Sequence, residues 1–187
     1  GVPLSPYRAG GYSGYFGWAN QSQQVRFSNA DGDFDISSTD DFTFEFWVNF
    51  PDVTESWQRI IYKHPSNSFV IYKYHAAGEI TFNNPGTNVT TSGANMQNNT
   101  WHHVAIVRNS GTINIYIDGT SRATSANTSS LTYNSVWYFG TNNNSQHFKG
   151  YLCDFRWTLS AVYTSNFTPP TQRLTALTDT KLLFFNS

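Results

Sequence analysis

Residues 42–50 read Phe-Thr-Phe-Glu-Phe-Trp-Val-Asn-Phe, and this stretch decides the fold class. Its even-numbered positions are all apolar, whereas the odd-numbered positions between them are Thr, Glu, Trp and Asn. Only a β-strand places alternate residues on one face. The stretch therefore predicts a strand with one face in a hydrophobic core.

Two neighbouring stretches downstream extend this interpretation. Residues 112–118 read Thr-Ile-Asn-Ile-Tyr-Ile-Asp and repeat the alternation, and residues 101–108 precede them as a second apolar stretch. Asn109-Ser110-Gly111 lies between them and consists of residues that tolerate positive φ, so a hairpin is predicted there. Asp118-Gly119 predicts another turn at the end of the second strand.

Short strand candidates separated by turn residues continue along the rest of the chain, which predicts an all-β fold, an antiparallel β-sandwich. No helix longer than one turn, near Ser160–Tyr163, is expected. Residues 1–10 are predicted to be an N-terminal tail and residues 11–187 one domain. The last strand, Leu182–Phe185, lies in the most apolar stretch of the chain and is predicted to be central and buried. The other candidates are residues 24–27, 58–63, 69–74, 79–82, 136–139 and 150–157.

Composition excludes several classes of partner. Charged residues make up 12% of the 187 residues, about half the usual ~25%, and the net charge is −1. The Lys and Arg residues are scattered singly, so no basic face for a nucleic acid is expected. No apolar run is long enough for membrane insertion. Cys153 is the only cysteine, so no internal disulfide can form.

Four motifs in order carry a family resemblance: residues 42–48 (Phe-Thr-Phe-Glu-Phe-Trp-Val), 101–108 (Trp-His-His-Val-Ala-Ile-Val-Arg), 113–119 (Ile-Asn-Ile-Tyr-Ile-Asp-Gly) and 148–157 (Phe-Lys-Gly-Tyr-Leu-Cys-Asp-Phe-Arg-Trp). Over about residues 12–186, the chain resembles the laminin G-like domains of the concanavalin A-like lectin/glucanase superfamily. The resemblance implies a jelly-roll sandwich. It also implies an extracellular adhesin or a phage virion or tail protein, and hence an extracellular or virion location.

Glucanases of this superfamily supply their paired carboxylates from a Glu-x-Asp-x-x-Glu strand, but this chain has only Glu45, Glu55 and Glu79, none followed by Asp two residues later. We therefore expect no enzyme. Asp154 and Arg156 are two residues apart on a predicted strand, which favours a structural ion pair or a contact on the sheet surface.

Glycan binding requires an aromatic platform for the apolar face of a sugar, with planar amides for its hydroxyls. Aromatic and amide side chains both occur in the predicted loops. Most Trp residues are nevertheless expected in the core, and Asn-rich loops are often only solvent-exposed turns with local hydrogen bonds. The candidate carbohydrate-binding residues are Trp18, Trp57, Tyr74, His75, Asn142, Asn143, Asn144 and His147.

Asp31, Asp33 and Asp35 alternate within one turn-rich segment and could supply oxygen ligands to calcium. Calcium is common in the superfamily that the chain resembles, which makes it the one metal worth considering.

These observations favour a non-catalytic, lectin-like module that binds a glycan or polysaccharide. The alternative is a structural capsid-decoration or tail-fibre domain that contacts virion or cell-surface proteins without a glycan ligand. A large exposed apolar patch would favour the alternative, whereas an open groove lined with Trp, Tyr, Asn and Asp would favour the lectin.

Overall fold

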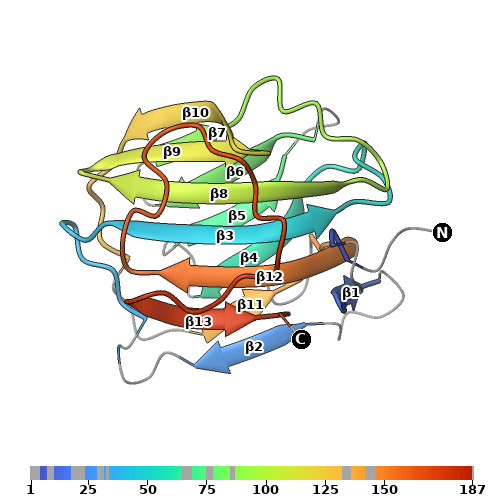
Figure 1. Cartoon of the computed structure of the whole chain (residues 1–187), viewed down its shortest axis with the longest axis horizontal. Coiled ribbons are helices and arrows are strands. Elements are labelled where there is room, and N and C mark those ends of the chain that lie inside the picture. Colours follow the sequence, from blue (N-terminus) through green and yellow to red (C-terminus); the bar gives the residue numbers. More distant parts are fainter. Residues whose placement is uncertain are drawn as a thin grey trace.

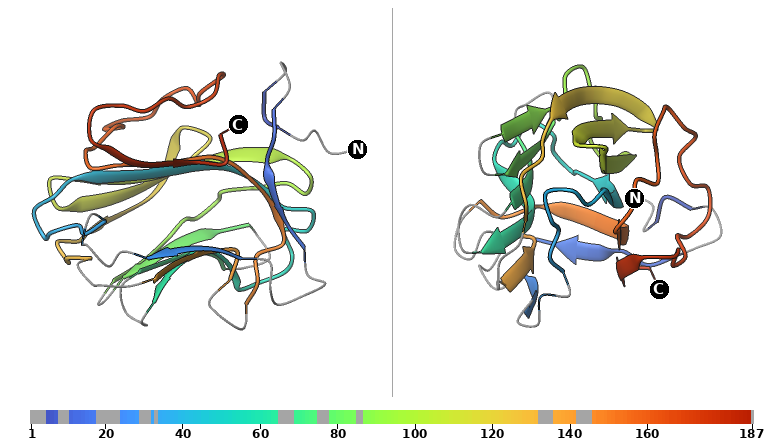
Figure 2. Two further views of the ribbon diagram at one scale, coloured as in Figure 1. Left: turned by 90° about the horizontal axis from the view of Figure 1, so that it is seen from below. Right: turned by 90° about the vertical axis from the view of Figure 1, so that its left-hand side faces the viewer.

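The computed structural model describes the chain except residues 1–4, 8–10, 18–23, 29–31, 33, 65–68, 75–77, 85–86, 132–135, 142–145 and 187. The strands form two stacked sheets (Figures 1 and 2), and every pair of named strands is antiparallel. The predicted all-β sandwich is therefore confirmed. In its described residues there is no helix, and so none that is long and apolar enough to cross a membrane.

The larger sheet, sheet A, has seven strands. Their order is β1 (Gly14–Phe16), β12 (Gly150–Thr158), β3 (Phe42–Asn49), β8 (Trp101–Asn109), β9 (Thr112–Ile117) and β10 (Thr120–Ala126), with β13 (Thr180–Phe184) also paired to β12. Sheet B has six strands in the order β2 (Val25–Ser28), β11 (Val136–Phe139), β4 (Gln58–His64), β5 (Phe69–Lys73), β6 (Ile80–Asn84) and β7 (Thr87–Thr90).

The core lies between the sheets and is rich in aromatic rings. The alternation of β3 places Phe42, Phe44 and Phe46 inside, where they are fully buried. The ring of Phe44 contacts Phe69 and Trp137, both from sheet B, at centroid distances of 5.1 and 6.0 Å. Such pairs add about 0.5–1.5 kcal/mol each beyond the area that they bury.

The predicted hairpin and turn are both present. Ser110 and Gly111 join β8 to β9 with φ of 48° and 77°. Asp118 and Gly119 join β9 to β10 with φ of 50° and 75°. A side chain at Gly119 would also collide with the backbone, because a Cβ there would lie 1.8 Å from the carbonyl oxygen of Phe167.

The prediction that the C-terminal strand is central was wrong. β13 pairs with β12 alone, and Leu182 and Phe184 are only partly buried. β12 is long enough to take two short partners on one edge: Gly150–Leu152 pairs with β1, and Phe155–Thr158 pairs with β13. The apolar side chains of β13 pack against the core from this edge, which explains an apolar strand without a central position.

The predicted ion pair between Asp154 and Arg156 does not form. The register of β12 against β3 shifts between Cys153 and Arg156, and Asp154 has φ 49°. This β-bulge turns the two side chains toward different partners. Arg156 binds Glu45, whereas the Asp154 carboxylate accepts hydrogen bonds from the Tyr7 hydroxyl and the Leu174 amide.

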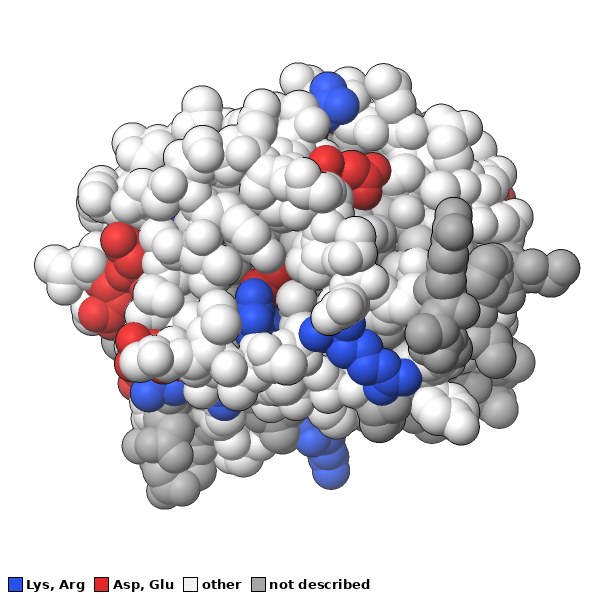
Figure 3. Space-filling model, in the orientation of Figure 1, with Lys and Arg blue, Asp and Glu red and all other residues white. Residues whose placement is uncertain are grey.

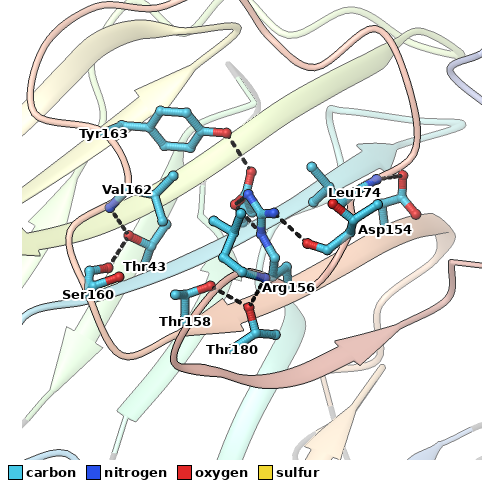
Figure 4. A network of polar contacts seen from close by, with 12 residues as sticks. Thr43, Asp154, Arg156, Thr158, Ser160, Val162, Tyr163, Leu174 and Thr180 are labelled. Atoms are coloured by element: carbon cyan, nitrogen blue, oxygen red, sulfur yellow. Dashed lines mark hydrogen bonds and ion pairs between the residues drawn. The ribbon is translucent and has the colours of Figure 1, made fainter.

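Residues 159–179 form a strap that crosses the outer face of sheet A (Figure 2). Figure 4 shows how the sheet holds it: the Thr43 hydroxyl bonds Ser160 and Val162, and the Asp154 carboxylate accepts the Leu174 amide. Arg156 also donates to the carbonyl of Thr175 at 2.7 Å. The rings of Tyr163 and Phe167 stack at 3.6 Å over Ala105, Val107 and Tyr116 of the sheet. The outer face of sheet A is therefore largely occupied by the chain itself.

Two lysines point into the sandwich from sheet B. The Lys63 ammonium donates to the carbonyl of Leu131 at 2.7 Å, and the Lys73 ammonium donates to that of Val53 at 2.6 Å. Burial lowers the pKa of each from 10.5 to about 8. Between about pH 8 and 10.5, the unfolded chain thus binds more protons than the folded one, so folding stability rises with pH there.

The expected result is a free energy of unfolding that increases between pH 7.5 and 9, by on the order of 2 kcal/mol for both lysines together. Burial raises the pKa of Cys153 from 9.0 to about 12, which opposes the trend above pH 9. Urea unfolding at each pH measures the slope. Lys63→Met should reduce it by about half, whereas Lys181→Met, at an exposed position, should leave it unchanged. Equal slopes in both variants would contradict the assignment.

Candidate functional site

The outer face of sheet B carries a cluster of tyrosines. Tyr62, Tyr72, Tyr138 and Val70 alternate with core residues along β4, β5 and β11, and they form a small apolar cluster separate from the main core. The rings of Tyr62 and Tyr138 lie 6.2 Å apart across neighbouring strands. No strap like residues 159–179 covers this face within the described ranges. The tyrosines are buried, and they form a base for the side chains that lie over them.

Trp57 stands on this base, just before β4. Its ring is nearly parallel to that of Tyr72, at 12° and 5.6 Å, and nearly perpendicular to that of Tyr74, at 85° and 4.7 Å. The side chain remains 45% exposed. Trp57 has φ 62°, which is unusual for a bulky residue and is common at binding sites. The arrangement gives a flat exposed ring with a second ring at right angles to it.

Arg59 lies beside the same base. Its guanidinium carbon is 5.6 Å from the centre of the Tyr62 ring and 5.8 Å from that of Tyr72. Its Nε donates to the side-chain oxygen of Gln146, and its backbone amide donates to the Gln146 carbonyl at 3.0 Å. Burial against the rings lowers the pKa of Arg59, but an arginine remains charged at neutral pH.

The structure brings together three of the residues predicted for glycan binding. Trp57 contacts Tyr74 directly, and His147 forms an isolated β-bridge with Arg59. Trp18, His75, Asn142, Asn143 and Asn144 lie outside the described residues, so their part in the site stays a prediction. Sequence reasoning missed Arg59, Tyr72, Tyr62 and Tyr138, because each looks like an ordinary strand residue and a register shift between Arg59 and Ile61 breaks the alternation of β4.

The predicted calcium ligands are only partly described. Asp31 and Asp33 lie outside the described residues, and the Asp35 carboxylate is 3.8 Å from the Lys63 ammonium. Among the described residues, no group of three His, Cys, Asp or Glu side chains could hold a metal ion. Calcium at Asp31, Asp33 and Asp35 therefore stays a prediction.

The outer face of sheet A carries the strap and, below it, a buried ionic network. In Figure 3, the side with the strap is largely uncharged, with isolated basic and acidic side chains. Below the strap, Glu45 pairs with Arg156 and lies 3.3 Å from Nε2 of His103, and all three side chains are buried. A glycosidase needs two carboxylates that reach the substrate, and Glu45 does not reach solvent. These residues act as an anchor for the strap.

Solved structures share the fold at low identity. A protein from Bacteroides ovatus described as carbohydrate-binding matches with TM-score 0.67 and 16% identity, over 92% of this chain and 50% of its own. Domain 4 of an extracellular arabinanase from Geobacillus stearothermophilus, solved with arabinotriose, matches with TM-score 0.60 and 15% identity, over 82% of this chain and 78% of its own. Domains LG4-5 of the mouse laminin α1 chain match with TM-score 0.55 and 15% identity, over 86% of this chain and 46% of their own.

The chain thus spans about half the length of the Bacteroides protein. None of the curated proteins matches it in sequence. Residues 16–163, most of the domain, match the family described as the concanavalin A-like lectin/glucanases superfamily. The sandwich, the order of its motifs and this match agree, and the chain belongs to that superfamily.

Proposed function

We propose that this domain is a non-catalytic carbohydrate-binding module and that Trp57, Tyr74, Arg59 and His147 form its binding surface. The observation that carries the proposal is the exposed indole of Trp57, fixed flat by Tyr72 and flanked at right angles by Tyr74. A fixed aromatic ring stacks against the apolar face of a sugar and loses little conformational entropy on binding. The carbohydrate-binding neighbours of the same fold support this assignment.

A setting in an extracellular adhesin or a phage virion or tail protein fits the composition. Few charges and many Asn, Ser and Thr side chains make a polar surface with little net charge. A single shallow site of this kind binds in the ~mM to μM range, so repeated copies on one particle would supply avidity. The structural alternative would be favoured by a large apolar patch. Within the described residues, the exposed large hydrophobic side chains are Tyr12 and Tyr15 from the N-terminal segment, Trp57 before β4 and Leu177 in the strap.

Replacement of Trp57 tests the proposal. Trp57→Ala is expected to weaken glycan binding at least about tenfold, because the stacking surface is lost. The wild-type domain, displayed in many copies, is first applied to an array of plant, animal and bacterial surface polysaccharides. Affinity electrophoresis on the strongest hit then compares the variants.

Tyr12→Ala is the matched control, because Tyr12 is 74% exposed and lies outside the site. Trp57→Gly removes the same ring and also relieves the positive φ, so it separates lost binding from lost folding. An array without hits, or full binding by both Trp57 variants, would refute the proposed surface.

A further inference from the structure

Arg59 is a cation that is fixed in place but has no anionic partner. One nitrogen, Nε, is bound to the neutral side chain of Gln146, and the guanidinium lies against Tyr62 and Tyr72. Among the residues that the structure describes, no side chain or carbonyl accepts a hydrogen bond from its Nη1 or Nη2, and no carboxylate pairs with it. Those two nitrogens form the fork that binds a carboxylate or sulfate through two parallel hydrogen bonds.

The surroundings of Arg59 are poor in negative charge. The six strands of sheet B contain four cations, Arg26, Arg59, Lys63 and Lys73, and no Asp or Glu. Arg26 is exposed on the edge strand β2, and the two lysines lie beneath the face. Glu55, the acidic residue just before Trp57 in the chain, is paired with Lys149 at 3.7 Å. On the outer face, the strands themselves therefore contribute the charges of Arg26 and Arg59 and no carboxylate, while Glu79, just before β6, lies beside Tyr74, whose amide donates to its carbonyl at 2.8 Å.

Trp57 and Arg59 share one support. The Trp57 ring stacks on Tyr72, and the Arg59 guanidinium packs on the same Tyr72 ring. Both side chains therefore lie next to the same buried ring, and a single ligand that spans Trp57 and Arg59 can contact both. One end of such a site recognises the apolar face of a sugar, and the other recognises a planar anion.

We propose that the ligand of this surface is an acidic polysaccharide, in which a sugar ring stacks on Trp57 while a carboxylate or sulfate group is bound by the Nη1 and Nη2 atoms of Arg59. This rests on the proposed function and specifies its ligand class. A neutral glycan would leave the Nη1 and Nη2 atoms of Arg59 without an anionic partner.

Matched pairs of polysaccharides test the charge requirement. The probes are polygalacturonate, alginate and chondroitin, each beside its carboxyl-reduced form, and chondroitin sulfate beside chondroitin. On at least one backbone, the acidic form is expected to bind at least about tenfold more tightly than its carboxyl-reduced form, or chondroitin sulfate than chondroitin. The carboxyl pairs and the sulfate pair show which anion is used. Binding of the acidic form should weaken as NaCl is raised from 50 to 500 mM, because salt screens the charges.

Arg59→Gln is expected to abolish the difference between the acidic and reduced forms while the binding of the reduced form stays the same. Arg59→Lys keeps the charge but loses the fork, so it should retain only part of the preference. Arg173→Gln is the matched control, since it removes the same charge from the exposed strap on the other sheet. Circular dichroism and thermal melting confirm that each variant is folded.

Two failures can be told apart. If reduced and acidic forms bind equally well and Arg59→Gln changes nothing, the acidic-ligand proposal is wrong and the carbohydrate-binding proposal stands. If no polysaccharide of either kind binds, the carbohydrate-binding proposal fails and the acidic-ligand proposal fails with it.

Discussion

Glu45→Ala is expected to lower the free energy of unfolding by about 3–5 kcal/mol, because it leaves a buried arginine without its counter-charge. One carboxylate oxygen of Glu45 accepts hydrogen bonds from Nε and Nη2 of Arg156 at 2.8 and 2.5 Å. The other accepts the Tyr163 hydroxyl at 2.8 Å and lies 3.3 Å from Nε2 of His103. Urea unfolding measures the loss. Limited proteolysis should show new cleavage within residues 159–179, because Tyr163 tethers the strap to this carboxylate.

Lowering the pH should also reduce the free energy of unfolding through Glu45. Burial alone would raise the pKa of Glu45, but His103 and Arg156 outweigh it and hold that pKa below the usual 4.5. A carboxyl with a lowered pKa in the folded state stabilises the fold at neutral pH, and this stabilisation is lost as pH falls below about 4. The wild-type protein should lose stability in that range more steeply than Glu45→Gln does.

A double variant separates the buried charge from the packing. Glu45→Met together with Arg156→Met removes both charges and fills a similar volume, so it should recover most of the stability lost in Glu45→Ala. Glu79→Ala, a partly exposed carboxylate in another part of the fold, should change stability by less than about 0.5 kcal/mol. A change below about 1 kcal/mol in Glu45→Ala would mean that the network does not hold the strap.

Local pattern was sufficient for the strands that form the centre of the sandwich. β3 and β9 alternate, β8 is a continuous apolar stretch, and the turns that follow β8 and β9 contain residues that accept positive φ. What the pattern could not provide was the choice of partner for each strand. The apolar β13 is an edge strand because it pairs with the half of β12 that β1 does not cover. The bulge at Asp154 separates the side chains of Asp154 and Arg156, which simple alternation would place on one face. Both outcomes depend on contacts far apart in the sequence.

The candidate site likewise could be predicted from the sequence only in part. Trp57 and Tyr74 could be selected from the sequence because aromatic residues next to turns are exposed more often than those within strands. Arg59 and Tyr72 could not be ranked, because each has the spacing of an ordinary strand residue. Their importance comes from the pairing of β4 with β5, which places Arg59 directly opposite Tyr72. The register between strands, and not the composition of either, forms the mixed aromatic and cationic surface.

Arg108→Leu is expected to destabilise the fold by about 3 kcal/mol or more, because three carbonyl groups lose their common donor and the buried guanidinium is lost. Arg108 is fully buried near the end of β8, with its guanidinium carbon 4.9 Å from the centre of the Phe42 ring. Nε donates to the Asp40 carbonyl at 2.7 Å, Nη1 donates to that of Ser129 at 2.7 Å, and Nη2 donates to that of Ser37. One side chain thus joins two loops to the edge of the core.

Arg108→Lys distinguishes the hydrogen-bond fork from the charge alone. An ammonium group cannot reach three carbonyls that are placed around a planar guanidinium, so the lysine variant should regain less than half of the lost stability. Arg173→Leu, at an exposed position, should change stability by less than about 0.5 kcal/mol. Thermal unfolding followed by tryptophan fluorescence suits this comparison, because Trp137 and Trp157 are buried in the core. If lysine restores full stability, the charge over Phe42 matters and the three carbonyl contacts do not. If leucine is tolerated, the loops are held by other contacts, such as the Leu131 amide bound to the Ile36 carbonyl at 2.7 Å.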